Sequence, residues 1–543
     1  MNTIASLDIF IIVFYFVAIV VISYLATPHS RLRDSTEYYF LAGRNLGWLA
    51  IGISLFATNI SSEHFVGLAG YGATKGLAVG NIEWIAIFAL ILLGWCLAPL
   101  FLKADIYTMP EFFGKRFNTS TRLYLSGLTI IAYIITKISI SLFAGGLLLK
   151  ATLGWDMYTS AVVMMTITGI YTIVGGLNAV VFTSVFQAIL LIVGASVVTI
   201  CGLLEVGGFA GLYARLPADY FSIFKPLSDP DFPWLGVLLG APILAIWYWC
   251  TDQYIVQRIL SARNVCAARN GAILTAFLKL LPVFILVLPG LIAVALFPGI
   301  KGDEAFPILL NSSLLPAGLK GLAIVGVLSA LMSSLAASFI STSTLFTMDF
   351  YRYFQPQASE KKFVLVGRLA TTVMVIIGLL WIPLVKIFDN HMYVYLQSIQ
   401  AYISPPIAAV FLAGIFWKKL EGKGALIGLM TGGSLGVLRM IQQWSGSQWF
   451  SDFPVLHFFF AINFLHFAIF LFAFTFSVMV VFELLRQRIP REKTSNILIP
   501  ETNLEPFFKI KAFLTHSSKT DRYAWFLSAA LFIVLFSLWG VFF

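Results

Sequence analysis

Two ionisable side chains lie inside long apolar stretches of the sequence. Glu83 is found in GNIEWIAIF and Lys279 in AFLKLLP. A charge at the centre of a bilayer costs about 2.5–3.5 kcal/mol even on insertion scales, so such residues usually mark a functional site. If both face one cavity, they can neutralise each other while hydrogen-bonding a polar, uncharged ligand. The structural alternative is a pair that only holds two helices together.

Three consecutive aromatic residues, Trp247-Tyr248-Trp249, lie just before Asp252 in another apolar stretch. Aromatic faces stack on the C–H face of a pyranose, and amides and carboxylates bind its hydroxyl groups. On their own the three rings are also typical of ordinary packing. Considered with polar residues in other apolar stretches, they predict a sugar pocket that also contains Asn59, His64, Glu83 and Gln397.

A pair of hydroxyl side chains, Ser333 and Ser334, lies in the small-residue segment LSALMSSLAAS. Hard cations bind oxygen ligands, so hydroxyl groups beside free carbonyl groups suit a monovalent metal ion. Small residues in a membrane helix also let two helices approach closely. Both interpretations stay open at this point.

The composition places these residues in a membrane. The chain has 543 residues, of which 59% are hydrophobic and 11% are charged. Soluble globular proteins have about 25% charged residues, and so large an apolar excess cannot be buried in one core. A membrane-spanning helix needs about 20 apolar residues, and we find about fourteen such stretches. Residues 1–543 are therefore expected to form one all-helical transmembrane domain without a sizeable soluble part.

The expected spans run at about 7–27, 47–73, 77–102, 121–149, 156–175, 178–204, 234–258, 267–297, 319–345, 363–387, 391–417, 423–443, 455–485 and 523–543. Spans 47–73, 234–258 and 391–417 carry several polar residues each, and the last also contains Pro405-Pro406. We therefore expect these three to be poor continuous helices. Irregular backbone at membrane depth survives only where it is buried in protein or lines a wet cavity.

Two of the interrupted spans, 47–73 and 234–258, are five spans apart. This spacing indicates an inverted five-helix repeat, in which the corresponding helices meet at a binding site near the midplane. The core repeats are expected at about 47–204 and 234–417.

The net charge of +10 follows from membrane topology. With the N-terminus outside and every stretch crossing, most lysines and arginines fall in inner loops. The outer loops then hold only Lys75, Lys150, Arg215, Lys225, Lys301, Lys320 and Lys386. This is the positive-inside bias. It predicts that both termini are outside, and it removes nucleic acid as the explanation for the basic charge.

Enzyme motifs are nearly absent from the sequence. It contains no HExxH, no Walker loop and no Cys/His metal spacing. The run GGSLG at 432–436 matches G-x-S-x-G, but it lies within an apolar span rather than at a strand-to-helix turn. We predict that the protein is not an enzyme, and a membrane enzyme is only a distant alternative.

The chain resembles the sodium/solute symporters, in particular the sodium–glucose cotransporter branch, which includes vertebrate sodium/glucose cotransporters and a bacterial sodium/galactose symporter. The matching segments follow the family order from about residue 36 to residue 424. They are YYFLAGRNLGWLAIGISLFATNISSEHFVGLAGYG, IEW, IYTMPEFFGKRF, ITKIS, YTIVGGLNAVVFT, WYWCTDQYIVQRILSA, LKLLPVFILVLPG, LSALMSSL, STLFTMDFY and PPIAAVFLAGIFWKK.

The resemblance implies a LeuT-like fold, with one extra helix before and three behind two inverted sets of five, and alternating-access symport of sodium with a hexose such as glucose or galactose. It implies sodium ligands from the carbonyl groups of Ala57, Ile60 and Ala330 and the hydroxyl groups of Ser333 and Ser334. The implied sugar ligands are Asn59, His64, Glu83, Lys279 and Gln397. Tyr248 resembles the inner gate on which the sugar stacks, with Trp249 beside it. An outer lid is implied at Leu68, Ile82 and Tyr393.

The chain departs from the family pattern at four positions. Members with a second sodium site carry an aspartate where this sequence has Ser184, and two expected hydroxyl residues are Ala336 and Ala337. The resemblance therefore implies one sodium per sugar. A hydroxyl or amide residue of sugar-binding relatives is replaced by Ala245, so one sugar contact is missing.

Two other functions stay open: a sodium-coupled carrier of another polyol such as myo-inositol, and a sugar sensor that does not transport. The expected location is the plasma membrane. Segment 298–318 is short and lacks the cysteines of vertebrate members, which favours a bacterial inner membrane. The oligomeric state is not predicted.

Overall fold

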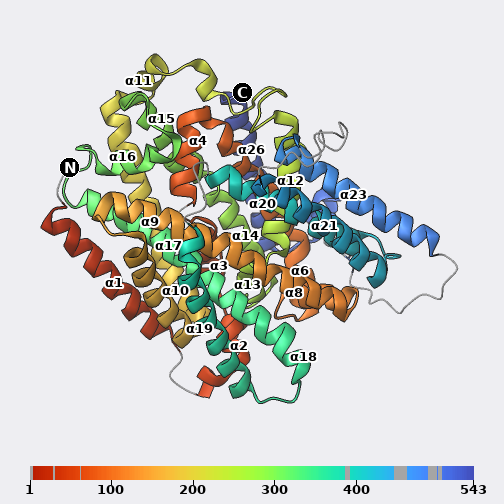
Figure 1. Ribbon diagram of the computed structural model, residues 1–543. Coiled ribbons are helices and arrows are strands. Elements are labelled where there is room, and N and C mark those ends of the chain that lie inside the picture. The colour runs from red at the N-terminus through yellow and green to blue at the C-terminus, as the bar shows by residue number, and fades with distance from the viewer. Residues whose placement is uncertain are drawn as a thin grey trace.

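The fold is known from a computed structural model, which describes residues 4–27, 31–61, 63–385, 392–445, 461–486, 498, 500 and 504–543. Within these residues the chain is helical almost throughout, and no β-strand is formed. The predicted all-α membrane fold is confirmed. Figure 1 shows the helices as one bundle, with α11, α15 and α16 at one end and α2 and α18 at the other.

The membrane-spanning helices are, in chain order, α1 (Ser6–Ala26), α3 and α4 (Trp48–Asn59 and Ala69–Lys75), α5 and α6 (Gly80–Leu92 and Ala98–Ala104), α8 and α9 (Thr119–Tyr133 and Ser139–Leu153), α10 (Met157–Val206), α12 and α13 (Ala241–Ala245 and Gln253–Leu260), α14 and α15 (Val265–Leu278 and Leu288–Leu296), α17 (Leu319–Leu345), α19 (Glu360–Val385), α20 (Met392–Phe416), α21 (Gly422–Ser445), α23 (Phe464–Leu485) and α26 (Lys519–Val541). Shorter helices connect them: α2 (Thr36–Leu41), α7 (Met109–Arg116), α11 (Gly208–Arg215), α16 (Ala305–Asn311), α18 (Arg352–Phe354), α24 (Glu505–Phe508) and α25 (Ile510–His516).

Eleven helices of the described chain are long and apolar enough to cross a membrane. One of them, α10, contains two of the predicted spans, because its backbone bends sharply at Gly176, where φ is 60°. A side chain at this position would meet the Tyr39 carbonyl oxygen at 2.5 Å. Dividing α10 there, and adding the two interrupted segments described next, gives the predicted fourteen crossings.

Two of the three predicted interruptions are present. Helix α3 ends at Asn59, Ile60 is extended, and a π-helical turn at His64–Leu68 leads into α4. In the other, the π-helical segment Ile246–Thr251 is followed by an extended Asp252, which caps α13. In both places the backbone leaves the helix at a cluster of polar side chains, whose groups can bond the freed peptide atoms.

The third predicted interruption, in span 391–417, is wrong. Helix α20 runs without a break from Met392 to Phe416, with Pro405 and Pro406 inside it. Pro406 cannot donate to the carbonyl oxygen of Tyr402. That oxygen is covered by α21, where a side chain on Gly436 would come within 2.0 Å of it. The neighbouring helix therefore packs directly against the carbonyl oxygen that Pro406 leaves without its helical hydrogen bond.

Helix α17 lies at the centre of the bundle. Its apolar stretch is entirely buried, whereas only 17% of the apolar stretch of α1 is buried. Small residues bring α17 close to α10: a Cβ on Gly194 would lie 3.1 Å from the Gly326 Cα. Gly326 lies just before the segment LSALMSSLAAS, so the close-packing interpretation of that segment stays a prediction. The hydroxyl groups of Ser333 and Ser334 in that segment contact α3, as described below.

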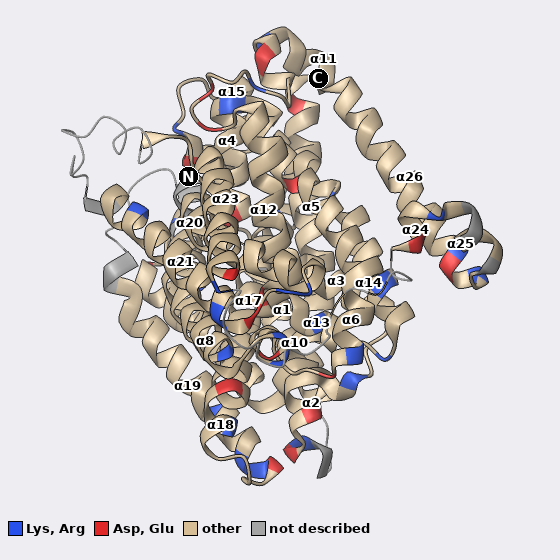
Figure 2. Cartoon of the chain, turned by 90° about the vertical axis from the view of Figure 1, so that its right-hand side faces the viewer, with Lys and Arg blue, Asp and Glu red and all other residues tan. Residues whose placement is uncertain are grey.

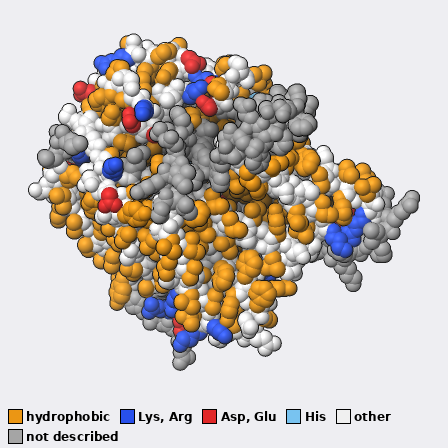
Figure 3. Space-filling model, in the orientation of Figure 1, with side chains coloured by type: hydrophobic (Ala, Val, Ile, Leu, Met, Phe, Trp, Pro, Cys, Tyr) orange, Lys and Arg blue, Asp and Glu red, His pale blue; other side chains and the backbone are white. Residues whose placement is uncertain are grey.

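The outer surface agrees with a lipid environment. Hydrophobic side chains cover the middle of the molecule in Figure 3, and charged side chains lie mainly above and below this band. Figure 2 shows from a second direction that lysine, arginine, aspartate and glutamate gather toward the two ends of the bundle. Some charged residues at mid-height lie at the side of the bundle, on α24 and α25 (Figure 2), and others, such as Glu83 and Lys279, are buried in the interior, where the candidate site lies.

Candidate functional site

A central cavity lies beside the first interruption. Its empty space, counted together with the open solvent at its mouth, is about 530 Å³. All seven predicted sugar-pocket residues line it: Asn59, His64, Glu83, Tyr248, Trp249, Lys279 and Gln397. The rest of the lining consists of Glu63, Ile82, Ala86, Ala241, Leu244, Ala245 and Gln400.

The cavity is lined by helices that are distant in sequence. Asn59 ends α3, Glu83 is on the first turn of α5, and Gln397 is on α20. Lys279 follows the last residue of α14, and the Trp84 indole N–H donates to the carbonyl oxygen of Leu280 at 3.4 Å. This contact fastens α5 to the end of α14 and so places the predicted carboxylate and ammonium groups side by side.

Lys279 and Glu83 form a buried ion pair. The lysine ammonium also donates to the Asn59 side-chain oxygen at 2.8 Å. Removing charges from water is costly unless they are paired and hydrogen-bonded. Because both charges are compensated, the cavity can offer a hydroxyl group strong donors and acceptors without a net charge from this pair.

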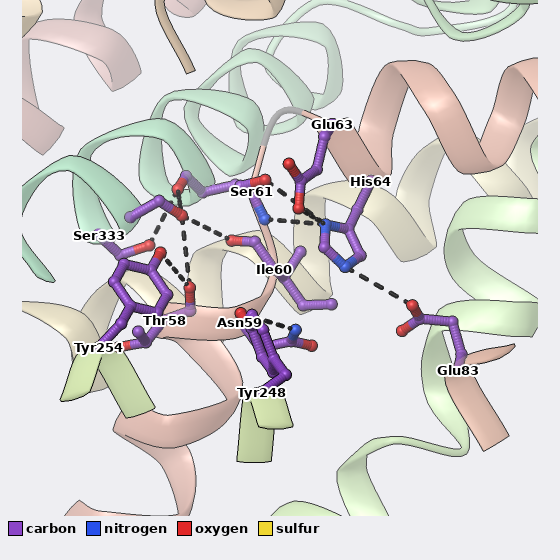
Figure 4. Close-up of polar contacts among 12 residues, drawn as sticks. Thr58, Asn59, Ile60, Ser61, Glu63, His64, Glu83, Tyr248, Tyr254 and Ser333 are labelled. Carbon is purple, nitrogen blue, oxygen red and sulfur yellow. Dashed lines mark hydrogen bonds and ion pairs between the residues drawn. The ribbon is translucent and has the colours of Figure 1, made fainter. Parts of the chain in front are cut away.

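His64 is held in one tautomer by its neighbours (Figure 4). The backbone N–H of Ser61 donates to its Nδ1 at 3.3 Å, so Nδ1 accepts and the proton is on Nε2. Nε2 lies 3.6 Å from a carboxylate oxygen of Glu83, and Nδ1 lies 3.6 Å from a carboxylate oxygen of Glu63. The histidine therefore contacts the unwound backbone with one ring nitrogen and presents the other to Glu83 in the cavity.

Aromatic rings form another wall of the cavity. The amide of Asn59 donates to the Tyr248 hydroxyl at 3.2 Å. The rings of Tyr248 and Trp249 meet edge to face with centroids 5.2 Å apart, and the Lys279 ammonium lies 5.6 Å from the Trp249 ring centroid. Such a surface can stack on an apolar ligand face while Asn59 and Lys279 bind its polar edge.

Unlike the predicted sugar-pocket residues, the predicted lid residues do not all line the central cavity. Ile82 lines the cavity. Leu68 is fully buried in the π-helical turn and is not among the cavity-lining residues. Tyr393 lies at the start of α20, but its side chain is outside the described residues.

The five predicted sodium ligands come together where α3 unwinds against α17. The Ser333 hydroxyl donates to the carbonyl oxygens of Ala57 at 2.9 Å and Ala330 at 3.0 Å. The Ser334 hydroxyl lies 3.4 Å from the Ile60 carbonyl oxygen and 2.9 Å from that of Ala330. The group contains oxygen atoms and no charge, and rotation of the hydroxyl groups would turn their lone pairs toward an ion. Their assignment as ligands stays a prediction.

Several residues near these groups were not predicted. The Tyr254 hydroxyl donates to the Thr58 carbonyl oxygen at 2.8 Å (Figure 4). Glu63 and Gln400 also line the cavity. The sequence shows Glu63 among the polar residues of an interrupted span, which could have identified it. No sequence signal indicates that Tyr254, from the second interruption, reaches back to the first.

The chain is similar to the proteins of one known family. Residues 39–432 match the sodium:solute symporter family. Sodium/glucose cotransporter 4 of Danio rerio is 40% identical over 81% of this chain and 72% of its own length. Sodium/glucose cotransporter 1 of Ovis aries is 39% identical over 89% and 79%, and the sodium/myo-inositol cotransporter of Homo sapiens is 39% identical over 80% and 67%.

The fold is also found in a solved structure of a sodium-coupled sialic acid symporter in a substrate-bound, outward-open state. It superimposes with a TM-score of 0.78 over 90% of this chain and all of that one, at 22% identity. At this identity the likeness concerns the fold, and it supports the LeuT-like arrangement expected from the sequence. The matched span and the identity of the relatives settle the family: the chain is a member of the sodium:solute symporter family, a multi-pass membrane protein that co-transports sodium with a small-molecule solute.

Proposed function

We propose that the protein carries a hexose such as glucose or galactose across the plasma membrane, by alternating access, with one sodium ion per sugar. The observation that supports this most is the composition of one cavity. A compensated ion pair, three amides, a histidine and the carboxyl group of Glu63 lie there with two aromatic rings. An uncharged ring with many hydroxyl groups fits such a lining better than a charged or apolar solute.

Coupling follows from the shared position of the two sites on one interrupted helix. Ala57 and Ile60 belong to the proposed ion site, and Asn59 and His64 face the cavity. An ion bound at the carbonyl groups would fix the backbone that presents these two side chains. The sugar then binds better to the sodium-loaded protein, and by linkage sodium binds better to the sugar-loaded protein.

The energy of one ion is sufficient for accumulation. Each positive charge that moves inward gains about 2.3 kcal/mol per 100 mV, and a tenfold sodium gradient adds about 1.4 kcal/mol. Together these support a sugar gradient of a few hundred-fold. The single-ion stoichiometry rests on Ser184, Ala336 and Ala337 in place of oxygen-rich residues, and a reversal potential indicating two charges per sugar would contradict it.

We further infer the orientation and the repeat boundaries from the sequence. The bias of lysine and arginine toward one side supports both termini outside. The two interruptions five spans apart support inverted repeats at about 47–204 and 234–417. A bacterial inner membrane is the proposed location, on the basis of the short segment 298–318.

Uptake by reconstituted protein tests the proposal. Proteoliposomes with an inward sodium gradient should accumulate labelled glucose or galactose, and replacing external sodium by choline or lithium should abolish the accumulation. Equal uptake with choline would contradict sodium-coupled sugar transport. Empty liposomes in the same buffers give the background.

The second candidate solute is myo-inositol, because a sodium/myo-inositol cotransporter is nearly as similar to this chain as the sodium/glucose cotransporters. The missing polar group at Ala245 is a further reason to include it. Labelled myo-inositol belongs in the same uptake series, and preferential accumulation of it would replace the hexose. A sodium current that responds to sugar without labelled uptake would instead indicate a sensor.

A further inference from the structure

A buried lysine outside the predicted sites lies between them. Lys137 is in the π-helical segment Ile134–Ile138, which joins α8 to α9, and only 7% of its surface is exposed. Its ammonium nitrogen lies 4.3 Å from the ring centroid of Tyr248 and 4.7 Å from that of Tyr254. The two rings are themselves 6.4 Å apart, so one cation contacts both.

These two rings belong to different sites. Tyr248 lines the cavity and accepts a hydrogen bond from Asn59. Tyr254 donates to the Thr58 carbonyl oxygen, one residue from the Ala57 carbonyl of the proposed ion site. A lysine that attracts both ring faces therefore connects the sugar-facing ring to the ion-facing backbone.

The helix that leads into the Lys137 segment, α8, also contacts the helix break at Asp252, which lies between Tyr248 and Tyr254 in the sequence. Tyr133, one turn before Lys137, donates its hydroxyl proton to Asp252 and accepts from the backbone N–H of Tyr254 at 2.8 Å. Within the described residues no carboxylate lies within ion-pair distance of the Lys137 ammonium, although Asp252 and Glu63 act on it electrostatically. Among the described residues, its direct contacts are thus with the two rings.

We propose that Lys137 is a positioning residue for coupling: its ammonium group holds Tyr248 and Tyr254 together, so that ion binding at the Ala57 and Ile60 carbonyl groups, on either side of the Thr58 carbonyl bonded to Tyr254, fixes the Tyr248 ring beneath the sugar. The inference rests on the proposed sugar site. Without the cation, the Tyr248 ring and the ion-facing backbone move independently. Each ligand then binds with less dependence on the other.

The test compares coupling rather than transport alone. Purified full-length protein is titrated with labelled galactose and with labelled glucose, each in saturating sodium and in choline. For each sugar, the dissociation constant in choline divided by that in sodium is the coupling factor. Lys137→Met, which keeps the length of the side chain and removes the charge, should lower this factor by about fivefold or more. Lys137→Arg, which keeps a cation against the rings, should retain most of it. Lys150→Met is the matched control, since Lys150 is an exposed lysine on the same membrane-crossing segment.

Two results would overturn the proposal: an unchanged coupling factor in Lys137→Met, or an equal loss in Lys137→Arg. If Lys137→Met is not recovered folded, Tyr254→Phe decides, because it keeps the ring and removes only the hydroxyl bonded to Thr58. It should lower coupling while sugar binding in choline stays unchanged, and normal coupling would contradict the inference. Failure of the wild type to bind either sugar is a different result, which contradicts the proposed function and removes the basis of this inference with it.

Discussion

The two interrupted helices differ in what closes their breaks. At the first, the neutral hydroxyl groups of Ser333 and Ser334 contact the carbonyl oxygens of Ala57 and Ile60. At the second, the Asp252 carboxylate caps α13 and accepts a hydrogen bond from the Tyr133 hydroxyl. The first break is held by weak, exchangeable partners, and the second by a charged group of the protein.

This difference separates the roles of the two breaks. Hydroxyl groups can rotate and exchange a carbonyl partner for a cation, because the oxygen atoms stay where they are and only protons move. The Asp252 carboxylate accepts both of its hydrogen bonds at Oδ1 and carries no proton that could rotate away from a carbonyl partner. The first break is therefore suited to bind a transported ion, and the second is suited to hold the aromatic wall of the cavity in place.

The largest expected effect comes from the ion pair beside the first break. Lys279→Met should reduce sugar uptake to background and lower the free energy of unfolding by about 3–5 kcal/mol, because Glu83 is left buried without its partner. Uptake in proteoliposomes and thermal unfolding measure the two effects. Adding Glu83→Gln should recover the stability but not the uptake. Transport at wild-type rates by the single variant would show that the pair is only structural.

Ser334→Ala tests whether the first break is an ion site. Losing one oxygen ligand should weaken apparent sodium affinity by about tenfold, or about 1.4 kcal/mol, measured as the sodium dependence of uptake. Ser338→Ala is the control, since Ser338 lies one turn further along α17 and donates to the Ser334 carbonyl oxygen at 3.0 Å. An unchanged sodium curve for Ser334→Ala would remove the distinction between the breaks.

Asp252→Ala tests whether the second break is structural. It removes a helix cap and leaves the Tyr133 hydroxyl without its acceptor, so the free energy of unfolding should fall by about 1–3 kcal/mol. Asp252→Asn keeps a capping oxygen and should lose less. Apparent sodium affinity should change much less than in Ser334→Ala. If Asp252→Ala weakened apparent sodium affinity as much as Ser334→Ala, both breaks would bind the ion.

Gln397→Ala addresses a cavity residue that belongs to neither break. Loss of one amide contact should raise the KM for sugar by about fivefold, equivalent to about 1 kcal/mol, while sodium affinity stays near normal. Gln442→Ala is the control, because Gln442 lies on α21 and is not among the residues that line the central cavity. If both variants behave like the wild type, the assignment of Gln397 to the sugar is wrong.

Much of the fold could be predicted because each membrane helix can be recognised from its own stretch of sequence. About twenty apolar residues must be helical to satisfy their backbone in lipid, and polar residues inside such a stretch predicted the interruptions near Asn59 and Asp252. The same rule failed at Pro405-Pro406. There the helix continues, and Gly436 on another helix packs against the Tyr402 carbonyl oxygen, a contact that no local pattern shows.

The sequence by itself determined the membrane location, the number of crossings, two of the interruptions and the identity of the charged and aromatic residues that gather in the cavity. These follow from composition and from the cost of polar groups in lipid, which are properties of single segments. Only the tertiary structure decided which groups meet: that Lys279 reaches both Glu83 and Asn59, that Tyr254 returns to the Thr58 carbonyl, and that Lys137 contacts two rings. Such contacts join residues up to 220 positions apart, and they depend on how the helices pack rather than on any one helix.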